Sequence, residues 1–513
     1  MAELDLAGLL GALSIATDLG AGLPSGTSMR TCLVATCVAD QLGMPDATRS
    51  SVYFAGLLRH LGCTAFAHEA AELAGDDHDL IRTFEAVDSA NKRKVIGRAI
   101  GGLAKGTGTG KRAKAIANVL THPQAPRRLA AAQCDQASAL ARDLGFGDTV
   151  ATALQQMYER HDGKGDPHRM RGDAIAVEAR IVHAAQVIEA LYRHGDRAAT
   201  LAEIEKRRGR QLAPEACDAA LAAGDALWAA LDSQTPHEDV LAVPRIAAPR
   251  GVLGEIALAF GRFADLKMPF AVGHSTAVAT LAVDAGRHAG LPEPEVERLR
   301  LAALLHDLGA VSVGNQVWDR AGPLGVTGWE QVRLHAYHTE RILALSPATR
   351  PLAALAGAHH ERLDGSGYPR GGRELGRPER ILAAADEYAA LVEARPYRAA
   401  LPPDDAAKAL AADAAAGKLC REAVACVLAA AGQPVAAAKR SLPAGLTERE
   451  AEVLGLVARG LVSKEIAVAL DIATRTVKHH IEHVYAKTGV STRAAAALFA
   501  ARHDLVATRP NDP

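Results

Sequence analysis

The stretch "AGLPEPEVERLRLAALLHDLG" at residues 289–309 carries the helical pattern that decides the fold. Apolar residues at Val296, Leu299 and Ala303 follow helical spacing, and Gly309 stands where a glycine C-cap would end the helix. The stretch "LGMPDATRSSVYFAGLLRHLG" at residues 42–62 matches it without a gap, 247 positions earlier. The sequence therefore predicts two copies of one helical unit.

A second repeated segment sets the length of an insertion. The segment "AHHERLDGSGYPRGG" at 358–372 shares its frame with "MYERHDGKGDPHRM" at 157–170, but here the copies are 202 positions apart. The first copy therefore carries 45 extra residues between Gly62 and about Gln133. The insertion includes "KGTGTGKRAKAIANV", whose glycine spacing does not fit a phosphate loop. We expect a solvated loop there.

Length and composition favour a soluble protein of several domains. The 513 residues exceed what one core holds, and 49% hydrophobic with 23% charged residues is ordinary for globular proteins. The net charge of −1 gives no information about the protein's partners. The N-terminus lacks a basic signal-peptide region, and no apolar run reaches the roughly 18 residues of a membrane span. Seven scattered cysteines without a CxxC pair indicate reduced thiols and a cytoplasmic protein.

The pattern predicts an all-α chain in three parts. No stretch alternates convincingly as a strand, and abundant alanine favours helix. Pro/Gly/Ala-rich stretches mark two breaks. We expect a first helical domain at 1–235, a linker at 236–250, a second helical domain at 251–432, a linker at 433–445 and a compact C-terminal domain at 446–513.

The second copy concentrates side chains that bind metals. Seven of them fall on five helical segments: His274, His306, Asp307, His335, His359, His360 and Asp386. Imidazoles and carboxylates without thiolates suit iron, manganese or zinc. Asp386 lies in an Ala-rich helix, where a buried carboxylate is unfavourable without a cation. Any one of these residues alone would be ordinary, but the set predicts two metal sites about 3.5–4 Å apart, which activate water and hold a phosphoryl group.

These residues occur within the motifs "GHS", "LLHDLG", "RLHAYHTERIL", "HHERLDGSGYPRG" and "RILAAADEYAAL", and "RPYR" follows them. Over about residues 258–401 the chain resembles the HD-GYP phosphodiesterases of the HD superfamily. The resemblance implies cleavage of cyclic di-GMP at an iron or manganese centre, with all seven residues as metal ligands and Asp307 bridging the metals. It implies that His306 and Asp307 are catalytic. It also implies that Tyr368, Arg395 and Arg398 bind substrate, the arginines through phosphate.

Three departures from the family pattern qualify this expectation. Ala310 stands where the family has a lysine that contacts phosphate, and "GRELGRPERI" lacks the usual Gly-x-x-Ile-Pro loop. Phe270 stands where trinuclear members have a glutamate, so two divalent ions are expected, iron or manganese first and zinc as the alternative. The metal site is complete in sequence, while the grip on substrate is weakened.

The first copy has lost every one of these metal ligands. The aligned positions hold Thr27 for His274, Arg59 and His60 for His306 and Asp307, Gln133 for His335, Met157 and Tyr158 for His359 and His360, and Gln186 for Asp386. We expect a degenerate HD-GYP-like domain that keeps the shape without the metal. A sensor, a dimer surface and a brace for the second copy are the alternatives for its role.

The C-terminal domain has the pattern of a DNA reader. Thr447 and Glu450 form a capping box, and Ser463 and Thr474 are expected to cap the next two helices. Val477, Ile481 and Val484 share one face at helical spacing, which is the expected buried stripe. The opposite face carries the polar row that a recognition helix needs to reach bases: Arg475, Lys478, His479 and Glu482.

The motifs "LTEREAEVL", "KEIA" and "TVKHHIEHVYAKTGVSTR" closely resemble the LuxR-type helix-turn-helix family over this whole domain. The resemblance implies four helices, DNA as partner and a homodimer formed through the last helix, at about 492–502. The complete sequence therefore predicts a cytoplasmic bacterial-type regulator that couples a phosphodiesterase acting on cyclic di-GMP or a related nucleotide to DNA binding. The alternative is a transcription factor whose core senses a nucleotide or another phosphoester without significant hydrolysis; Ala310 and the DNA-binding domain favour it, and the intact ligand set favours the enzyme.

Overall fold

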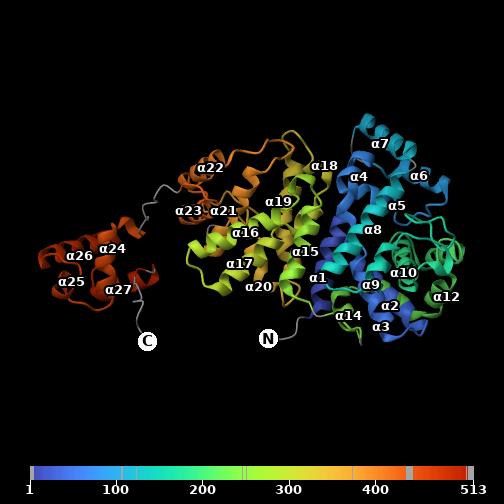
Figure 1. Cartoon of the computed structure of the whole chain (residues 1–513), viewed down its shortest axis with the longest axis horizontal. Coiled ribbons are helices and arrows are strands. Elements are labelled where there is room, and N and C mark those ends of the chain that lie inside the picture. The colour runs from blue at the N-terminus through green and yellow to red at the C-terminus, as the bar shows by residue number, and fades with distance from the viewer. Residues whose placement is uncertain are drawn as a thin grey trace. The chain divides into compact units, whose positions relative to one another are not determined.

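The computed structural model describes residues 5–104, 108–122, 124–244, 246–249, 251–372, 374–434, 443–503 and 505. The chain forms two compact units, Met1–Pro434 and Val435–Pro513. All regular structure in the described ranges is helical, apart from isolated β-bridges (Figure 1). The predicted all-α class is therefore confirmed.

The first unit holds both copies of the repeat. The first copy comprises α1 (Leu6–Gly20), α2 (Thr27–Gln41), α3 (Asp46–Leu58), η1 (Cys63–Phe66), α4 (Ala67–Ala74), α5 (Asp77–Phe84), α6 (Lys92–Gly102), α7 (Thr109–Thr121), α8 (Ala125–Asp143), α9 (Asp148–Gln155), η2 (Gly172–Ala174), α10 (Val177–Arg193), α11 (Arg197–Arg207), α12 (Pro214–Ala222), α13 (Asp225–Asp232) and α14 (Pro236–Leu241).

The second copy follows directly. It comprises α15 (Leu253–Asp265), η3 (Pro269–Ala271), α16 (His274–His288), α17 (Glu293–Leu305), η4 (Leu308–Ser312), α18 (Asn315–Trp318), α19 (Val326–Leu343), α20 (Arg350–Ala356), α21 (Arg377–Val392), α22 (Pro403–Ala415) and α23 (Arg421–Ala430). The second unit comprises η5 (Pro443–Gly445), α24 (Glu448–Ala458), α25 (Ser463–Ala469), α26 (Thr474–Thr488) and α27 (Arg493–Arg502).

The two copies share one hydrophobic core. It runs from Leu9 and Leu13 of α1 to Phe260 and Phe263 of α15 and on to Leu428 of α23. Helix α1 packs against η4 and α19, so the first copy touches the segment that follows His306 and Asp307 (Figure 1). Burial of apolar surface therefore holds the copies together as it holds each copy together.

The internal repeat extends to individual hydrogen bonds. The carboxylate of Asp18 accepts bonds from the backbone nitrogen of Ser28 at 3.0 Å and from its hydroxyl at 2.5 Å. The carboxylate of Asp265, 247 positions later, accepts the same two bonds from Ser275 at 3.2 and 2.6 Å. Each pair fixes the start of the helix that carries the first metal-ligand position.

Gly309, and Gly62 at the equivalent position of the first copy, each allow two backbone segments to approach closely. A Cβ on Gly309 would overlap the carbonyl oxygen of His335, and a Cβ on Gly62 would overlap that of Gln133. The expectation that Gly309 caps the helix is wrong, because α17 ends at Leu305 and Gly309 lies within η4. The glycine is needed because two backbones meet there without room for a side chain.

Two segments are more ordered than expected. Residues 109–121, in the region of the expected solvated loop, form α7. Ala115 of this helix is buried, and Ile116 and Val119 pack against a small apolar cluster that includes residues of α4 and α5. Residues 105–107 lie outside the described ranges. The expected linker at 236–250 begins as helix α14, with Val240 buried against the first copy. Most of the expected linker at 433–445 lies outside the described residues.

Candidate functional site

Six structural elements bring the seven metal-capable side chains of the second copy to one place. His274 opens α16, His306 caps α17, and Asp307 precedes η4. His335 lies within α19, the adjacent pair His359 and His360 follows α20, and Asp386 lies within α21. Five of these residues are at least nine-tenths buried, and Asp307 and His360 are half-buried beside them, so the cluster lies inside the helical fold rather than on its surface.

Three of the histidines are oriented by the same local bond. The Nδ1 atoms of His306, His335 and His359 each face the backbone carbonyl three residues earlier, at 2.7 Å for His306 and for His359. Because a carbonyl can only accept, Nδ1 carries the proton and Nε2 keeps its lone pair. Each helical segment therefore presents an unprotonated nitrogen to the centre, as metal-binding histidines do.

The donors form two groups with Asp307 between them. One group is His335, His359 and His360, the other is His274, His306 and Asp386, and within each group the ligand atoms lie within 4.8 Å of one another. One oxygen of Asp307 lies 3.4 Å from Nε2 of His335 and 3.5 Å from Nε2 of His359. Its other oxygen lies 3.6 Å from Nε2 of His306 and 4.0 Å from Nε2 of His274. A carboxylate in this position can bridge two ions.

The ionised carboxylates of the cluster favour the binding of cations. Burial opposes a charge on His274, but the carboxylates of Asp386 and Glu393 outweigh it and raise its pKa to about 10. Burial alone would raise the pKa of Asp307 and of Asp386, yet the surrounding imidazoles hold both well below the usual range. Burial lowers the pKa of His335 to about 4. The carboxylates are thus ionised in a buried place, which is stable only beside positive charge.

Two further observations fit divalent metal. Nε2 of His306 is buried and has no hydrogen-bond partner. Nε2 of His335 lies 3.0 Å from Nε2 of His359, so two lone pairs converge on one point. A shared cation relieves both arrangements, because it accepts several nitrogen lone pairs at once. The donor set therefore fits metal ions.

Glu393 joins the site although sequence reasoning missed it. One of its carboxylate oxygens lies 3.1 Å from Nδ1 of His274, on the side away from Asp386. Glu393 follows Asp386 by seven positions, at the end of α21, so the two face the same direction along the helix. That spacing is the signal that could have found it.

The expected substrate residues differ in their surroundings. Arg395 donates to Glu393 at 2.8 Å, and its guanidinium lies 5.0 Å from the centre of the Phe270 ring, so it stays beside His274. Tyr368 stacks on His360 with ring centres 4.7 Å apart. Arg398 instead donates to backbone carbonyls at the end of α21, including Ala390 at 2.6 Å. Its donors therefore stabilise the helix end.

Ala310 lies in an apolar cluster next to the ligand pair. Its side chain is fully buried with Met268 and Ala271, and Phe270 and Trp318 pack against them. The indole nitrogen of Trp318 donates to the carbonyl of Ala310 at 3.1 Å. An apolar contact thus replaces the charged contact that the family resemblance implied at this position.

In the first copy, a buried guanidinium stands at the position of His306. Arg59 is 1% exposed and donates from Nε to Nε2 of His60 at 2.9 Å. The other positions hold neutral groups: Tyr158 donates to Gln133 at 2.7 Å, and Thr27 bonds a backbone carbonyl. Among the described residues no group of metal donors gathers at these aligned positions. A buried guanidinium therefore stands where the second copy has a metal-capable imidazole.

A third group of metal-capable side chains lies at the start of α5: Asp76, Asp77 and His78. A lysine from the second copy already serves this group. The ammonium of Lys267, which is 0% exposed, pairs with Asp77 and lies 2.9 Å from Nε2 of His78. The group is therefore an ion-pair network that joins the two copies.

The second unit presents the predicted polar row. Val477 and Val484 are buried, Ile481 is half-buried, and Arg475, Lys478, His479 and Glu482 are all exposed on α26. The capping box of Thr447 and Glu450 is present. The expected caps at Ser463 and Thr474 are wrong, because both residues lie inside their helices and the side chain of Glu465 bonds the backbone of Val462 instead.

Comparison with known proteins agrees with this geometry. The HD domain family matches residues 120–215 and 260–419, and the family of bacterial regulatory proteins, luxR family, matches residues 444–500. The chain belongs to the HD-GYP phosphodiesterases of the HD superfamily and carries a C-terminal LuxR-type helix-turn-helix domain. It is 31% identical to the 3'3'-cGAMP-specific phosphodiesterase 3 of Vibrio cholerae over 415 residues. The aligned region covers 78% of this chain and 89% of that protein.

One solved structure and a further relative are also similar to the chain. The crystal structure of a cyclic GMP-AMP specific phosphodiesterase from Vibrio cholerae superposes with a TM-score of 0.56 and 27% identity, covering 83% of this chain and 97% of that one. The cyclic di-GMP phosphodiesterase of Thermotoga maritima is 34% identical over 150 residues, 28% of this chain and 40% of that protein. No helix in the described ranges has the length and apolar character to cross a membrane.

Proposed function

We propose that the second copy is a metal-dependent phosphodiesterase acting on a cyclic dinucleotide, and that the C-terminal domain binds DNA. The observation that carries the proposal is the position of Asp307, between two groups of three donors whose lone pairs converge. One relative is a 3'3'-cGAMP-specific phosphodiesterase, and a second is a cyclic di-GMP phosphodiesterase. Both named substrates are cyclic dinucleotides, which defines the substrate class.

Different residues of the proposed site would have different roles. All seven donors would hold two divalent ions, iron or manganese first and zinc as the alternative. When bound, such a pair lowers the pKa of a water and stabilises negative charge on phosphoryl oxygens. Arg395 lies beside His274 and would orient the scissile phosphate through its guanidinium. Tyr368, stacked on His360, would exclude water from the other side.

The experiment measures metal and hydrolysis together. Protein purified without chelators should contain about two transition-metal ions per chain and cleave 3'3'-cGAMP or cyclic di-GMP. Asp307→Asn should lose metal and activity, while Asp284→Asn, an exposed aspartate on α16, should keep both. Wild-type protein that holds no metal after anaerobic purification, or a metal-loaded Asp307→Asn variant, would refute the proposed centre.

A second candidate function rests on Ala310. Because Ala310 lies in an apolar cluster, its position provides no ammonium beside His306 and Asp307 to contact a substrate phosphate. This favours a domain that binds a nucleotide without significant hydrolysis. Tight, metal-dependent binding of a cyclic dinucleotide with no cleavage would support this sensor and exclude the enzyme. In either case the partner of the second unit is DNA, and a homodimer through α27 is the proposed assembly, tested by solution mass measurement.

A further inference from the structure

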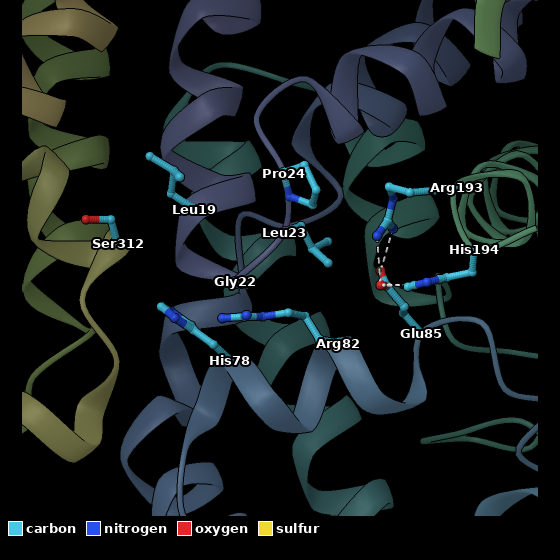
Figure 2. Close-up of a pocket in the computed structure, with 10 residues that line it drawn as sticks. All are labelled: Leu19, Gly22, Leu23, Pro24, His78, Arg82, Glu85, Arg193, His194 and Ser312. Atoms are coloured by element: carbon cyan, nitrogen blue, oxygen red, sulfur yellow. Dashed lines mark hydrogen bonds and ion pairs between the residues drawn. The ribbon is translucent and has the colours of Figure 1, made fainter. Parts of the chain in front are cut away.

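A pocket lies between the two copies, and none of the seven metal-capable side chains is among its lining residues. It has a volume of about 450 Å³, within the range of about 300–1,000 Å³ typical of small-molecule sites. Figure 2 shows its walls: Leu23 and Pro24 from the loop before α2, Arg82 and Glu85 from the α5 segment, Arg193 from the end of α10, and Ser312 from η4 of the second copy. Both copies therefore contribute to one cavity.

The pocket is the first copy's counterpart of the region beside His274. Leu23 and Pro24 precede α2 as Phe270 and Ala271, 247 positions later, precede α16. Helices α10 and α21 begin 200 positions apart, so Arg193 corresponds to Glu393. Where the second copy places a carboxylate that supports a histidine, the first copy places a guanidinium. The side chain at this position thus has opposite charge in the two copies.

The charges lining the pocket suit an anion. Arg82 is exposed, and within the described ranges it makes no hydrogen bond or ion pair. Figure 2 shows its guanidinium running along the floor of the pocket toward His78 and away from Glu85. Burial and the ammonium of Lys267 lower the pKa of His78 to about 3, so its imidazole is neutral. Arg82 is thus a cation available to a ligand.

A second cation is held at the opposite wall. Arg193 donates to both oxygens of Glu85 at 2.9 and 2.7 Å and to Glu189 at 3.1 Å, so two carboxylates already compensate its charge. His194 lies 2.9 Å from the carboxylate of Glu85. The guanidinium of Arg82 can donate two parallel bonds to a phosphate, and these two bonds would fix the orientation of the ester. Leu19, Leu23 and Pro24 form an apolar wall that an uncharged part of the ligand would cover.

Helix α5 connects this pocket to the metal centre. At the start of α5, the carboxylate of Asp77 accepts a hydrogen bond from the backbone nitrogen of Asn315 at 2.9 Å and pairs with Lys267. Just after the end of α5, the carboxylate of Glu85 accepts hydrogen bonds from Arg193. Lys267 follows by two positions Asp265, whose carboxylate fixes the segment that carries His274. A ligand that moves α5 therefore moves a support of the proposed centre.

We propose that this pocket binds a small phosphate ester of mononucleotide size through Arg82, and that its occupancy changes the activity of the second copy through α5 and Lys267. The effect on hydrolysis rests on the proposed function, but the binding does not. The first copy then acts as a sensor, one of the roles its lost ligands leave open.

Binding is tested on the full chain with GMP, AMP and glucose 6-phosphate as probes, by calorimetry. At least one ester should bind the wild type, and Arg82→Ala should weaken it by about tenfold or more, since a charge-assisted bond is lost. Arg98→Ala, an exposed arginine on α6, is the matched control and should bind like wild type. Inorganic phosphate should bind more weakly than the ester, because it leaves the apolar wall uncovered.

Arg395→Ala separates this pocket from the proposed substrate site, since it should leave the Arg82-dependent binding intact. The bound ester should change the rate of 3'3'-cGAMP hydrolysis in wild type and not in Arg82→Ala, whose basal rate should be normal. A chain that binds none of the probes, or binds them equally well in Arg82→Ala, overturns the site. Binding that depends on Arg82 in a chain without hydrolysis keeps the pocket and rejects the proposed enzyme instead.

Discussion

A carboxylate oxygen of Glu393 lies 3.1 Å from Nδ1 of His274, a residue 119 positions earlier in the chain. The bond orients the imidazole so that Nε2 faces Asp386 at 3.2 Å. Acceptors of this kind fix the tautomer of a metal-binding histidine and raise its basicity. Glu393 therefore supports the proposed centre without belonging to the seven donors.

Glu393→Gln should lower metal affinity by about 10- to 100-fold, the usual effect of losing such a partner. The measurement is metal content after equilibration with a metal buffer of known free concentration. Glu297→Gln, on the exposed face of α17, is the control. Equal affinities in wild type and Glu393→Gln would mean that the contact is structural only.

Ala310→Lys should raise hydrolysis of the cyclic dinucleotide, because an ammonium at this position adds a phosphate contact. The larger side chain must also fit among Met268 and Trp318, and overpacking a core typically destabilises by about 1–3 kcal/mol. Ala310→Met has similar length without the charge and measures that effect alone. The comparison is kcat/KM of the two variants, and equal values would show that charge at this position is irrelevant.

Asp77→Ala should destabilise the first unit by about 3–5 kcal/mol, because it leaves the buried ammonium of Lys267 without its carboxylate. Denaturant unfolding measures the change. The double variant Asp77→Leu with Lys267→Met should recover most of the loss, since it removes both charges. If the double variant is as unstable as Asp77→Ala, packing rather than charge pairing explains the effect.

Stability should fall as pH rises through the titration of Asp18. Burial raises the pKa of this carboxyl to about 7, against an ordinary value near 3.8 in the unfolded chain. Between these values the folded state binds more protons than the unfolded state, so raising the pH favours unfolding by up to about 1.4 kcal/mol per pH unit. Above about pH 7 the contribution is constant.

Asp18→Asn removes this titration and can still accept the bonds from Ser28. Its stability relative to wild type should therefore increase from pH 4 to about pH 7 and then level off. Denaturant midpoints measured at each pH provide the comparison. A difference that does not vary with pH would show that Asp18 titrates at its ordinary pKa.

Lys478→Ala should weaken specific DNA binding by roughly ten- to a hundredfold, because a base contact contributes about 1–3 kcal/mol. Lys478 is exposed on α26 beside Arg475 and His479, whereas Val477 and Val484 are buried. Binding should also fall steeply with salt as counterions are released. Lys408→Ala, an exposed lysine on α22, is the control for charge alone. Unchanged binding in Lys478→Ala would place the DNA contact on another face.

The sequence by itself determined the all-α class, the duplication and the set of metal-capable side chains. Helical spacing, repeated motifs and the offsets of 247 and 202 positions are local or directly comparable along the chain. The same holds for the polar row on α26 and for the capping box of Thr447 and Glu450, which depend on residues a few positions apart. Each therefore follows from residue types and their spacing.

Only the tertiary structure decided how these parts meet. The convergence of His335 on His359, the closeness of Gly309 to the carbonyl of His335, and the pairing of Asp77 with Lys267 join segments 24 to 190 positions apart. The shared core and the pocket beside Arg82 likewise arise where the two copies pack on each other. Such contacts depend on which faces long-range packing brings together, and no periodicity along a single chain specifies that geometry.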